Sequence, residues 1–73
     1  MIRCRLSVLL AERQLSVQDF AEAVGITPAN VTKLKNDRAK AVRFSTLEAM
    51  CRVLDCQPGD ILTREDVGPS DEG

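Results

Sequence analysis

Apolar residues recur at helical spacing near the start of the chain. Three leucines within residues 5–13 fall on one helical face, which predicts a first helix there. Residues 2–6 also alternate between apolar and charged side chains, a pattern that suits a short strand before this helix. A strand needs a partner, and the alternation within residues 61–67 is the only other candidate in the chain.

A second helix has clear start and stop signals. Ser16 is a good N-cap, and Asp19 stands three residues later, where it can reach back to the cap. Leu15 and Phe20 stand at the two positions of a hydrophobic staple. Gly25 follows the periodic run and is expected to end the helix in the left-handed conformation.

A third helix follows after a link of about three residues. Thr27 is its predicted N-cap, and Pro28 stands at the first helical position, where its missing N–H is harmless. Ile26 can pack on Val31 as a second staple. The third helix is expected to run to about Asn36, and a polar, basic loop follows it.

The remaining elements follow the loop of residues 37–43. Ser45 and Glu48 have the spacing of a capping box and predict the start of a fourth helix. Pro58 opens a last short helix that brings Ile61 onto the body. The apolar stripe of the fourth helix, and therefore its expected core face, comprises Leu47, Met50, Cys51 and Leu54.

Composition agrees with a small helical domain. The chain has 73 residues, of which 44% are hydrophobic, and its two phenylalanines are accompanied by no Trp or Tyr, so the core must be aliphatic. The expected fold class is therefore all-α, with five helices and short terminal strands as an addition. One domain is expected over residues 1–66, and residues 67–73 have the composition of a disordered acidic tail.

Charge is unevenly distributed along the chain. Residues 1–54 carry nine Lys or Arg against five Asp or Glu, a net charge of +4, whereas residues 55–73 carry one Arg against six acids, a net charge of −5. Five of the basic residues lie within residues 33–43, where the only acid is Asp37. The overall charge of −1 therefore does not exclude a polyanionic partner.

Several function classes are disfavoured. The chain has no histidine, which removes the commonest general base and metal ligand, and it is too short for a sizeable substrate cleft, so no catalysis, metal, cofactor or small-molecule substrate is expected. Three cysteines are an odd number that suits a reducing cytoplasm better than a secreted disulfide framework. Neither a signal peptide nor a membrane-spanning stretch is recognisable.

The second and third helices together have the layout of a helix-turn-helix. Both are short and capped, a glycine turn joins them, and the small Ala21 stands where the two helices must cross closely. With these features, residues 5–62 resemble the Xre family of phage-repressor and Cro-like transcription regulators, in its small single-domain form. The resemblance implies a five-helix, lambda-repressor-like domain that binds specific double-stranded DNA as a homodimer and usually represses transcription.

The chain departs from this family at two positions. Val17 stands where many relatives have a glutamine that contacts a phosphate, although Gln18 and the free N–H groups of the helix start can still bind one. Asp37 stands where a glycine often follows the recognition helix, so a different exit turn is expected.

The helical rotation separates a buried face of the recognition helix, residues 27–36, from a face directed at the major groove. Val31 and Leu34 define the buried face. The predicted base-facing residues on the opposite side are Ala29, Thr32, Lys33 and Asn36. The predicted phosphate contacts are Gln18, Thr27, Asn30, Lys35, Arg38, Lys40 and Arg43, whereas Arg3, Arg5, Arg13 and Arg52 are expected to be surface charges only.

Two further expectations concern partners. A single motif of this size buries little DNA surface, so a homodimer is expected. Its interface is expected at an apolar excess near Val8, Leu10 and Val53, at pairing of residues 2–5 with residues 61–67 of a second chain, or at a combination of the two. The alternative function is a protein-interaction module, such as the antitoxin of a toxin–antitoxin pair.

Overall fold

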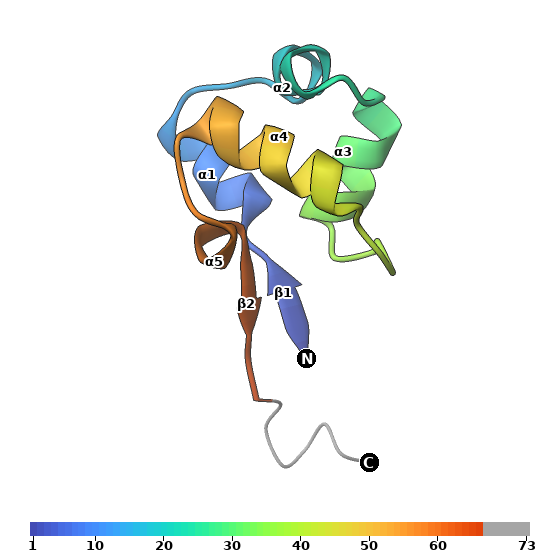
Figure 1. Ribbon diagram of the computed structural model, residues 1–73, viewed down its shortest axis with the longest axis vertical. Helices are drawn as coiled ribbons and strands as arrows, with labels where there is room; N and C mark the ends of the chain where they lie inside the picture. Colours follow the sequence, from blue (N-terminus) through green and yellow to red (C-terminus); the bar gives the residue numbers. More distant parts are fainter. Residues whose placement is uncertain (67–73) are drawn as a thin grey trace.

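The computed structural model describes residues 1–66, which form five helices and two short strands (Figure 1). This confirms the mostly helical fold with short terminal strands, while the predicted acidic tail of residues 67–73 lies outside the described residues. Among residues 1–66, no helix combines the length and apolar character that a membrane crossing requires. In chain order the elements are β1 (Ile2–Cys4), α1 (Leu6–Glu12), α2 (Val17–Val24), α3 (Pro28–Lys35), α4 (Phe44–Leu54), α5 (Pro58–Ile61) and β2 (Leu62–Arg64).

The predicted starts of α2 and α3 are confirmed by their caps. The Ser16 Oγ accepts a hydrogen bond from the Asp19 N–H at 3.0 Å, and the Thr27 Oγ1 accepts one from the Asn30 N–H at 3.2 Å. Both N-cap residues have extended backbone, and Pro28 opens α3 as expected. Each cap thereby provides a hydrogen-bond acceptor for one backbone N–H group that has no partner within its own helix.

The predicted start of α4 is wrong. The helix begins at Phe44 with Arg43 as its N-cap, so Ser45 lies inside the first turn and forms no capping box with Glu48. Packing explains the earlier start. Val42 and Leu47 occupy the two positions of a hydrophobic staple around the cap, and both pack against the core.

Each of the four longer helices ends at a residue with positive φ. These residues are Gln14 (54°), Gly25 (91°), Asp37 (59°) and Asp55 (52°). At each end, the N–H of the following residue donates to a carbonyl five positions back, which is the long hydrogen bond of a Schellman motif. Only the glycine was predictable, because a positive φ costs little without a Cβ.

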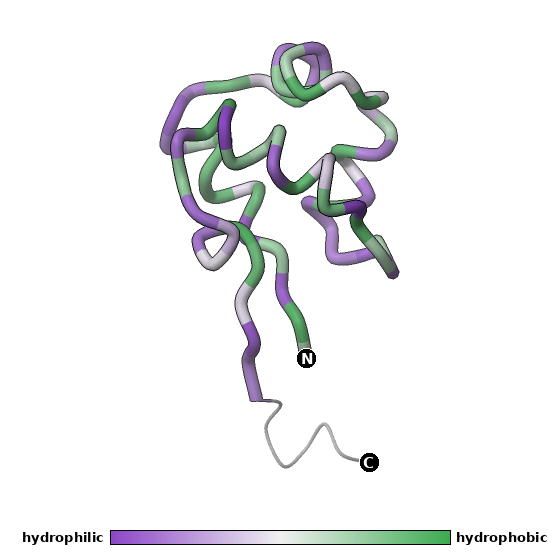
Figure 2. The backbone as a smooth tube through the Cα atoms, in the orientation of Figure 1, coloured by the Kyte–Doolittle hydropathy of each residue, from purple (hydrophilic) through white to green (hydrophobic). Residues whose placement is uncertain are grey.

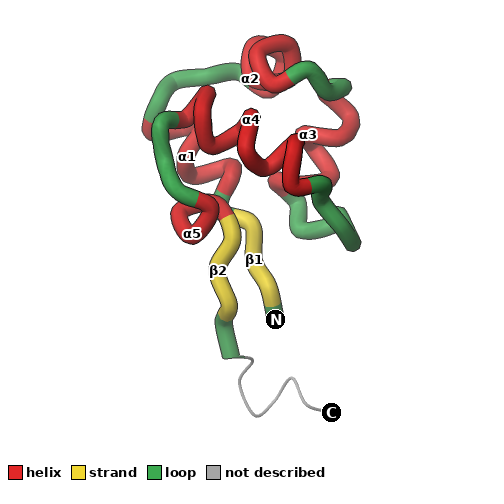
Figure 3. Tube along the Cα trace, in the orientation of Figure 1, coloured by secondary structure: helices red, strands yellow, loops and turns green. Residues whose placement is uncertain are grey.

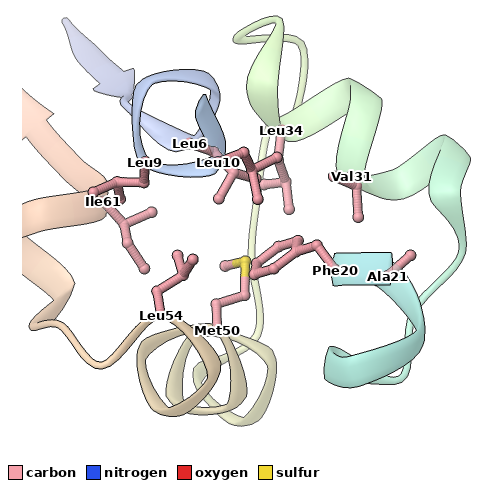
Figure 4. Packing of buried hydrophobic residues seen from close by; sticks show 10 residues of the cluster. All are labelled: Leu6, Leu9, Leu10, Phe20, Ala21, Val31, Leu34, Met50, Leu54 and Ile61. Atoms are coloured by element: carbon pink, nitrogen blue, oxygen red, sulfur yellow. The ribbon is translucent and has the colours of Figure 1, made fainter. Parts of the chain in front are cut away.

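One hydrophobic core, aliphatic apart from Phe20, lies between the helices (Figure 4). Phe20 from α2 and Met50 from α4 are fully buried at its centre, and the half-buried Cys51 packs at its margin. Arg13 is more than the predicted surface charge, because its Nε donates to the Leu54 carbonyl at 2.8 Å and ties α1 to the end of α4. The core residues are Leu6, Leu9, Leu10, Phe20, Ala21, Val31, Leu34, Met50, Leu54 and Ile61.

The two strands form an antiparallel ribbon that extends from the helical body (Figure 3). Cys4 pairs with Leu62, and Ile2 pairs with Arg64. The prediction that these segments pair between two chains is therefore wrong, because each segment finds its partner within its own chain. Leu10 is also buried in the core and is unavailable to a dimer surface.

Candidate nucleic-acid interface

Helices α2 and α3 cross closely because small and apolar side chains meet between them. Ala21 and Phe20 of α2 are buried together with Val31 of α3. Gly25, at φ 91°, turns the chain between the two helices, and the Ala21 carbonyl accepts hydrogen bonds from both Gly25 and Ile26. The result is the geometry of a helix-turn-helix with α3 as its second helix.

The outer face of α3 is open to solvent. Val31 is fully buried and Leu34 is 8% exposed, as the helical rotation predicted. All four predicted base-facing residues are exposed, which is the placement that contact with a base edge requires. They are Ala29, Thr32, Lys33 and Asn36.

A groove of about 540 Å³ runs between α3 and the loop that follows it. The groove brings together five of the predicted DNA-contacting residues: Asn30, Lys33, Arg38, Lys40 and Arg43. Its apolar lining comprises Ile26, Leu34, Ala39, Ala41 and Val42. Figure 2 shows that hydrophilic and apolar residues succeed one another along the loop. The structure thus unites residues from two segments in one basic surface.

The remaining predicted contacts lie outside this groove. Gln18 is exposed in the first turn of α2, and Lys35 is half-buried at the end of α3. The hydroxyl oxygen of Thr27 accepts the capping hydrogen bond. A phosphate at Thr27 would therefore meet a side chain already fixed in position by the cap.

The positive charge of the groove is not neutralised by the protein. The ion pairs formed within residues 1–66 involve Arg3, Arg13 and Arg64, none of which lines the groove. The four cations that do line it are Lys33, Arg38, Lys40 and Arg43. A group of exposed positive charges creates a positive potential that attracts a polyanion. When such charges neutralise phosphates, counterions leave the nucleic acid, and this release favours binding.

Two features of this region were not predicted from the sequence. Phe44 is 88% exposed at the start of α4, directly after the groove residue Arg43. Asp37 accepts a hydrogen bond from the backbone N–H of Cys4, in β1, at 2.8 Å. The sequence contains one signal for the contact between Cys4 and Asp37, because Asp37 stands where the family that the chain resembles often has a glycine.

The three cysteines are free and none of them lines the basic groove. Burial raises the pKa of the Cys4 thiol, and the nearby Asp37 carboxylate adds to the rise. Burial also raises the pKa of the Cys56 thiol, with smaller contributions from Cys51 and Asp60. Both thiols are therefore protonated at neutral pH, and a protonated thiol is a poor nucleophile. In the described part of the chain, no cluster of three Cys, Asp or Glu side chains could hold a metal ion.

Comparison with known sequences points to one family. Residues 5–66 match the model of the Cro/C1-type HTH DNA-binding domain. The chain is also 56% identical over 66 residues to YozG, an uncharacterized HTH-type transcriptional regulator of Bacillus subtilis strain 168. That alignment covers 86% of this chain and 79% of YozG.

Solved structures show the same fold. A putative DNA-binding protein from Bacteroides fragilis is similar with a TM-score of 0.76 at 21% identity, over 86% of this chain and all of that one. The clp gene regulator ClgR from Corynebacterium glutamicum is similar with a TM-score of 0.68 at 25% identity, over 75% of this chain and 57% of that one. A complex of the SinR and SinI proteins contains a chain that is similar with a TM-score of 0.74 at 18% identity, over 93% of this chain and 68% of that one.

Proposed function

Because the chain belongs to the Cro/C1-type HTH DNA-binding family and is a DNA-binding transcriptional regulator, we propose that it represses transcription by binding a specific operator as a homodimer. In this proposal α3 lies in the major groove, and the basic loop after it lies along the phosphate backbone. The proposal includes no catalytic step, no cofactor and no small-molecule substrate.

The observation that carries this proposal is the position of the basic groove beside the open face of α3. Lys33 lies on α3 and also lines the groove, so it stands between the expected base and phosphate contacts. Arg38 and Arg43 lie in the groove on the side of the loop. A duplex lying along the groove would present its major-groove edges to α3 and its backbone to the loop.

Each exposed residue of α3 has a role that its chemistry suits. Lys33 can donate to the O6 and N7 of guanine, and Asn36 can pair with adenine. Ala29 and the methyl group of Thr32 can contact the methyl group of thymine. We assign phosphate contacts to Gln18, Thr27, Asn30, Lys35, Arg38, Lys40 and Arg43.

The homodimer follows from the size of the interface. One helix-turn-helix covers too little DNA to discriminate well among sequences, whereas two copies read two half-sites about one helical turn, roughly 34 Å, apart. Since Leu10 belongs to the core, the apolar residues available to a second copy include Val8, Met1 and Ile2, which are 43%, 55% and 62% exposed.

The same proposal places the protein in the cytoplasm, where the three cysteines, all free, suit a reducing environment. The antitoxin alternative has no comparable support, since the matched family is described by DNA binding and the curated relative by transcriptional regulation.

Replacing Lys33 with alanine tests the base-facing assignment. We expect affinity for a duplex selected by the wild-type protein to fall by about 1–3 kcal/mol, because a bidentate contact with guanine is lost. Selection with the variant should relax the preference at one base position of each half-site. Fluorescence anisotropy on the selected duplex and on point variants of that duplex measures both effects.

Lys35→Ala is the matched control, since it removes the same charge from a half-buried position beside the base-facing side. It should weaken binding to all duplexes about equally, as a phosphate contact does. Unchanged base preference in Lys33→Ala would refute the role of Lys33.

A further inference from the structure

One carboxylate joins the exit of α3 to the terminal ribbon. Asp37 follows the last residues of α3, and its Oδ1 accepts a hydrogen bond from the backbone N–H of Cys4 at 2.8 Å. Its Oδ2 lies 3.5 Å from the Nε of Arg3. The side chain of Asp37 is 29% exposed, so water screens these contacts only partly. Residues 33 positions apart in the sequence are thereby connected.

The backbone of Asp37 also shapes the start of the basic loop. Its own N–H donates to the Leu34 carbonyl at 3.2 Å, and the N–H of Arg38 donates to the Lys33 carbonyl at 2.8 Å. These are the two hydrogen bonds of a Schellman motif, with Asp37 as its left-handed residue at φ 59°. The position of Asp37 therefore sets where Arg38 begins relative to Lys33.

The carboxylate meets the outer edge of β1. The Arg5 N–H donates to the Ile61 carbonyl at 2.7 Å, and the Glu65 N–H donates to the Met1 carbonyl at 2.8 Å. Because hydrogen-bonded pairs alternate along an antiparallel ladder, the N–H of Cys4 points away from β2. Asp37 supplies the acceptor that this edge otherwise lacks.

The loop after Asp37 separates two hollows. Residues 39–42 line the basic groove on one side and an apolar pocket of about 210 Å³ on the other. Ile2, Cys4 and Leu62 of the ribbon line this second pocket. The loop thus lies between α3 and the ribbon, and the hydrogen bond from Cys4 to Asp37 connects α3 and the ribbon at the start of the loop.

Asp55 shows that the turn itself does not need a carboxylate contact. It ends α4 at φ 52° with the same pattern of backbone hydrogen bonds. Within residues 1–66, however, its side chain forms neither a hydrogen bond nor an ion pair. The contacts of Asp37 are therefore additional to those that its backbone conformation requires.

We propose that Asp37 is a positioning residue for DNA binding, whose carboxylate holds β1 against the exit of α3 and so fixes the basic loop in the conformation that meets the phosphates. This inference rests on the proposed DNA interface. It makes an unusual prediction, because removing an acid beside a basic groove should by charge alone tighten DNA binding.

Two substitutions separate positioning from charge. Asp37→Gly keeps the left-handed turn but removes the carboxylate, and we expect about tenfold weaker binding as the loop loses its support. Asp37→Asn removes the same charge but keeps an acceptor for the Cys4 N–H, and it should bind at least as tightly as the wild type. The probe is a duplex of about 30 base pairs enriched by the wild-type protein from a random pool, read by anisotropy while circular dichroism shows each variant folded.

Two further variants test whether Asp37→Gly weakens DNA binding through the loss of the hydrogen bond between Cys4 and Asp37. Asp55→Gly makes the same change in the matched turn and should leave affinity within about twofold of wild type. Cys4→Pro removes the donor from the strand side, at an edge position where proline is tolerated, and this second variant tests the proposal even where Asp37→Gly fails to fold. The double variant Cys4→Pro with Asp37→Gly should lose no more DNA affinity than either single variant, because both substitutions remove the same hydrogen bond.

The outcomes are distinct. Equal affinity of Asp37→Gly and Asp37→Asn would overturn the proposal, as would an equal loss in Asp55→Gly or additive losses in the double variant. Failure of the wild-type protein to enrich any duplex would instead refute the proposed function. Amide hydrogen exchange at Cys4, fast in Asp37→Gly and slow in Asp37→Asn, would then still decide whether the carboxylate holds the strand.

Discussion

Replacing Arg38, Lys40 and Arg43 together with glutamine is expected to weaken DNA binding by a factor of about 10² to 10³ at roughly 0.1 M salt. The three side chains line the groove beside α3 and take part in no ion pair within residues 1–66. Each phosphate contact contributes about 0.9 to the slope of log K against log salt concentration, so the slope should fall by about 2.7. A salt titration of anisotropy measures it.

The control removes the same number of charges elsewhere. Arg5, Arg52 and Arg64 are exposed and lie outside the groove. Replacing these three with glutamine should change the salt slope by less than about 1, because none of them lines the groove in which the phosphate contacts are expected. An equal change of slope in the two triple variants would mean that net charge, and not the groove, governs binding.

Phe20→Ala is expected to remove a large share of the free energy of unfolding and to lower the melting temperature strongly. Phe20 is fully buried at the centre of the core, so its truncation costs about 3–5 kcal/mol in lost burial and cavity formation. The whole domain, at 73 residues, is stabilised by roughly 4–11 kcal/mol. Thermal unfolding followed by circular dichroism measures the loss.

The second phenylalanine provides the matched control. Phe44 is 88% exposed, so Phe44→Ala makes the same chemical change at the surface and should alter the free energy of unfolding by less than about 0.5 kcal/mol. Comparable destabilisation by the two substitutions would show that Phe20 is not at the centre of the core.

Local signals in the sequence predicted most of the helical framework. The caps at Ser16 and Thr27 and the turn at Gly25 depend on residues within three or four positions, so local chemistry was sufficient to find them. The buried and exposed faces of α3 followed from helical rotation alone, since Val31 and Leu34 are apolar and their neighbours are polar.

Features that depend on distant residues were missed or misplaced. The start of α4 is decided by packing of Val42 and Leu47 on the core, which overrides the capping box that Ser45 suggested. The contact of Arg13 with the Leu54 carbonyl spans 41 positions and leaves no local pattern. Hydrogen bonds between residues so far apart in the sequence cannot be predicted until the fold is known.

The candidate site divides in the same way. The spacing of basic residues predicted which side chains could contact DNA, but not that Lys33 of α3 and Arg38 and Arg43 of the loop would share one groove. Asp37 stood out in the sequence only as a replacement for glycine, and its partner in β1 became visible only with the fold.

Selection of duplexes from a random pool by the wild-type protein tests the central claim most directly. The account predicts enrichment of two related half-sites with centres about 10 base pairs apart, bound at least about 10³-fold more tightly than unselected DNA. A pool that remains random after repeated rounds, with affinity governed by salt alone, would contradict the claim that α3 reads a specific operator.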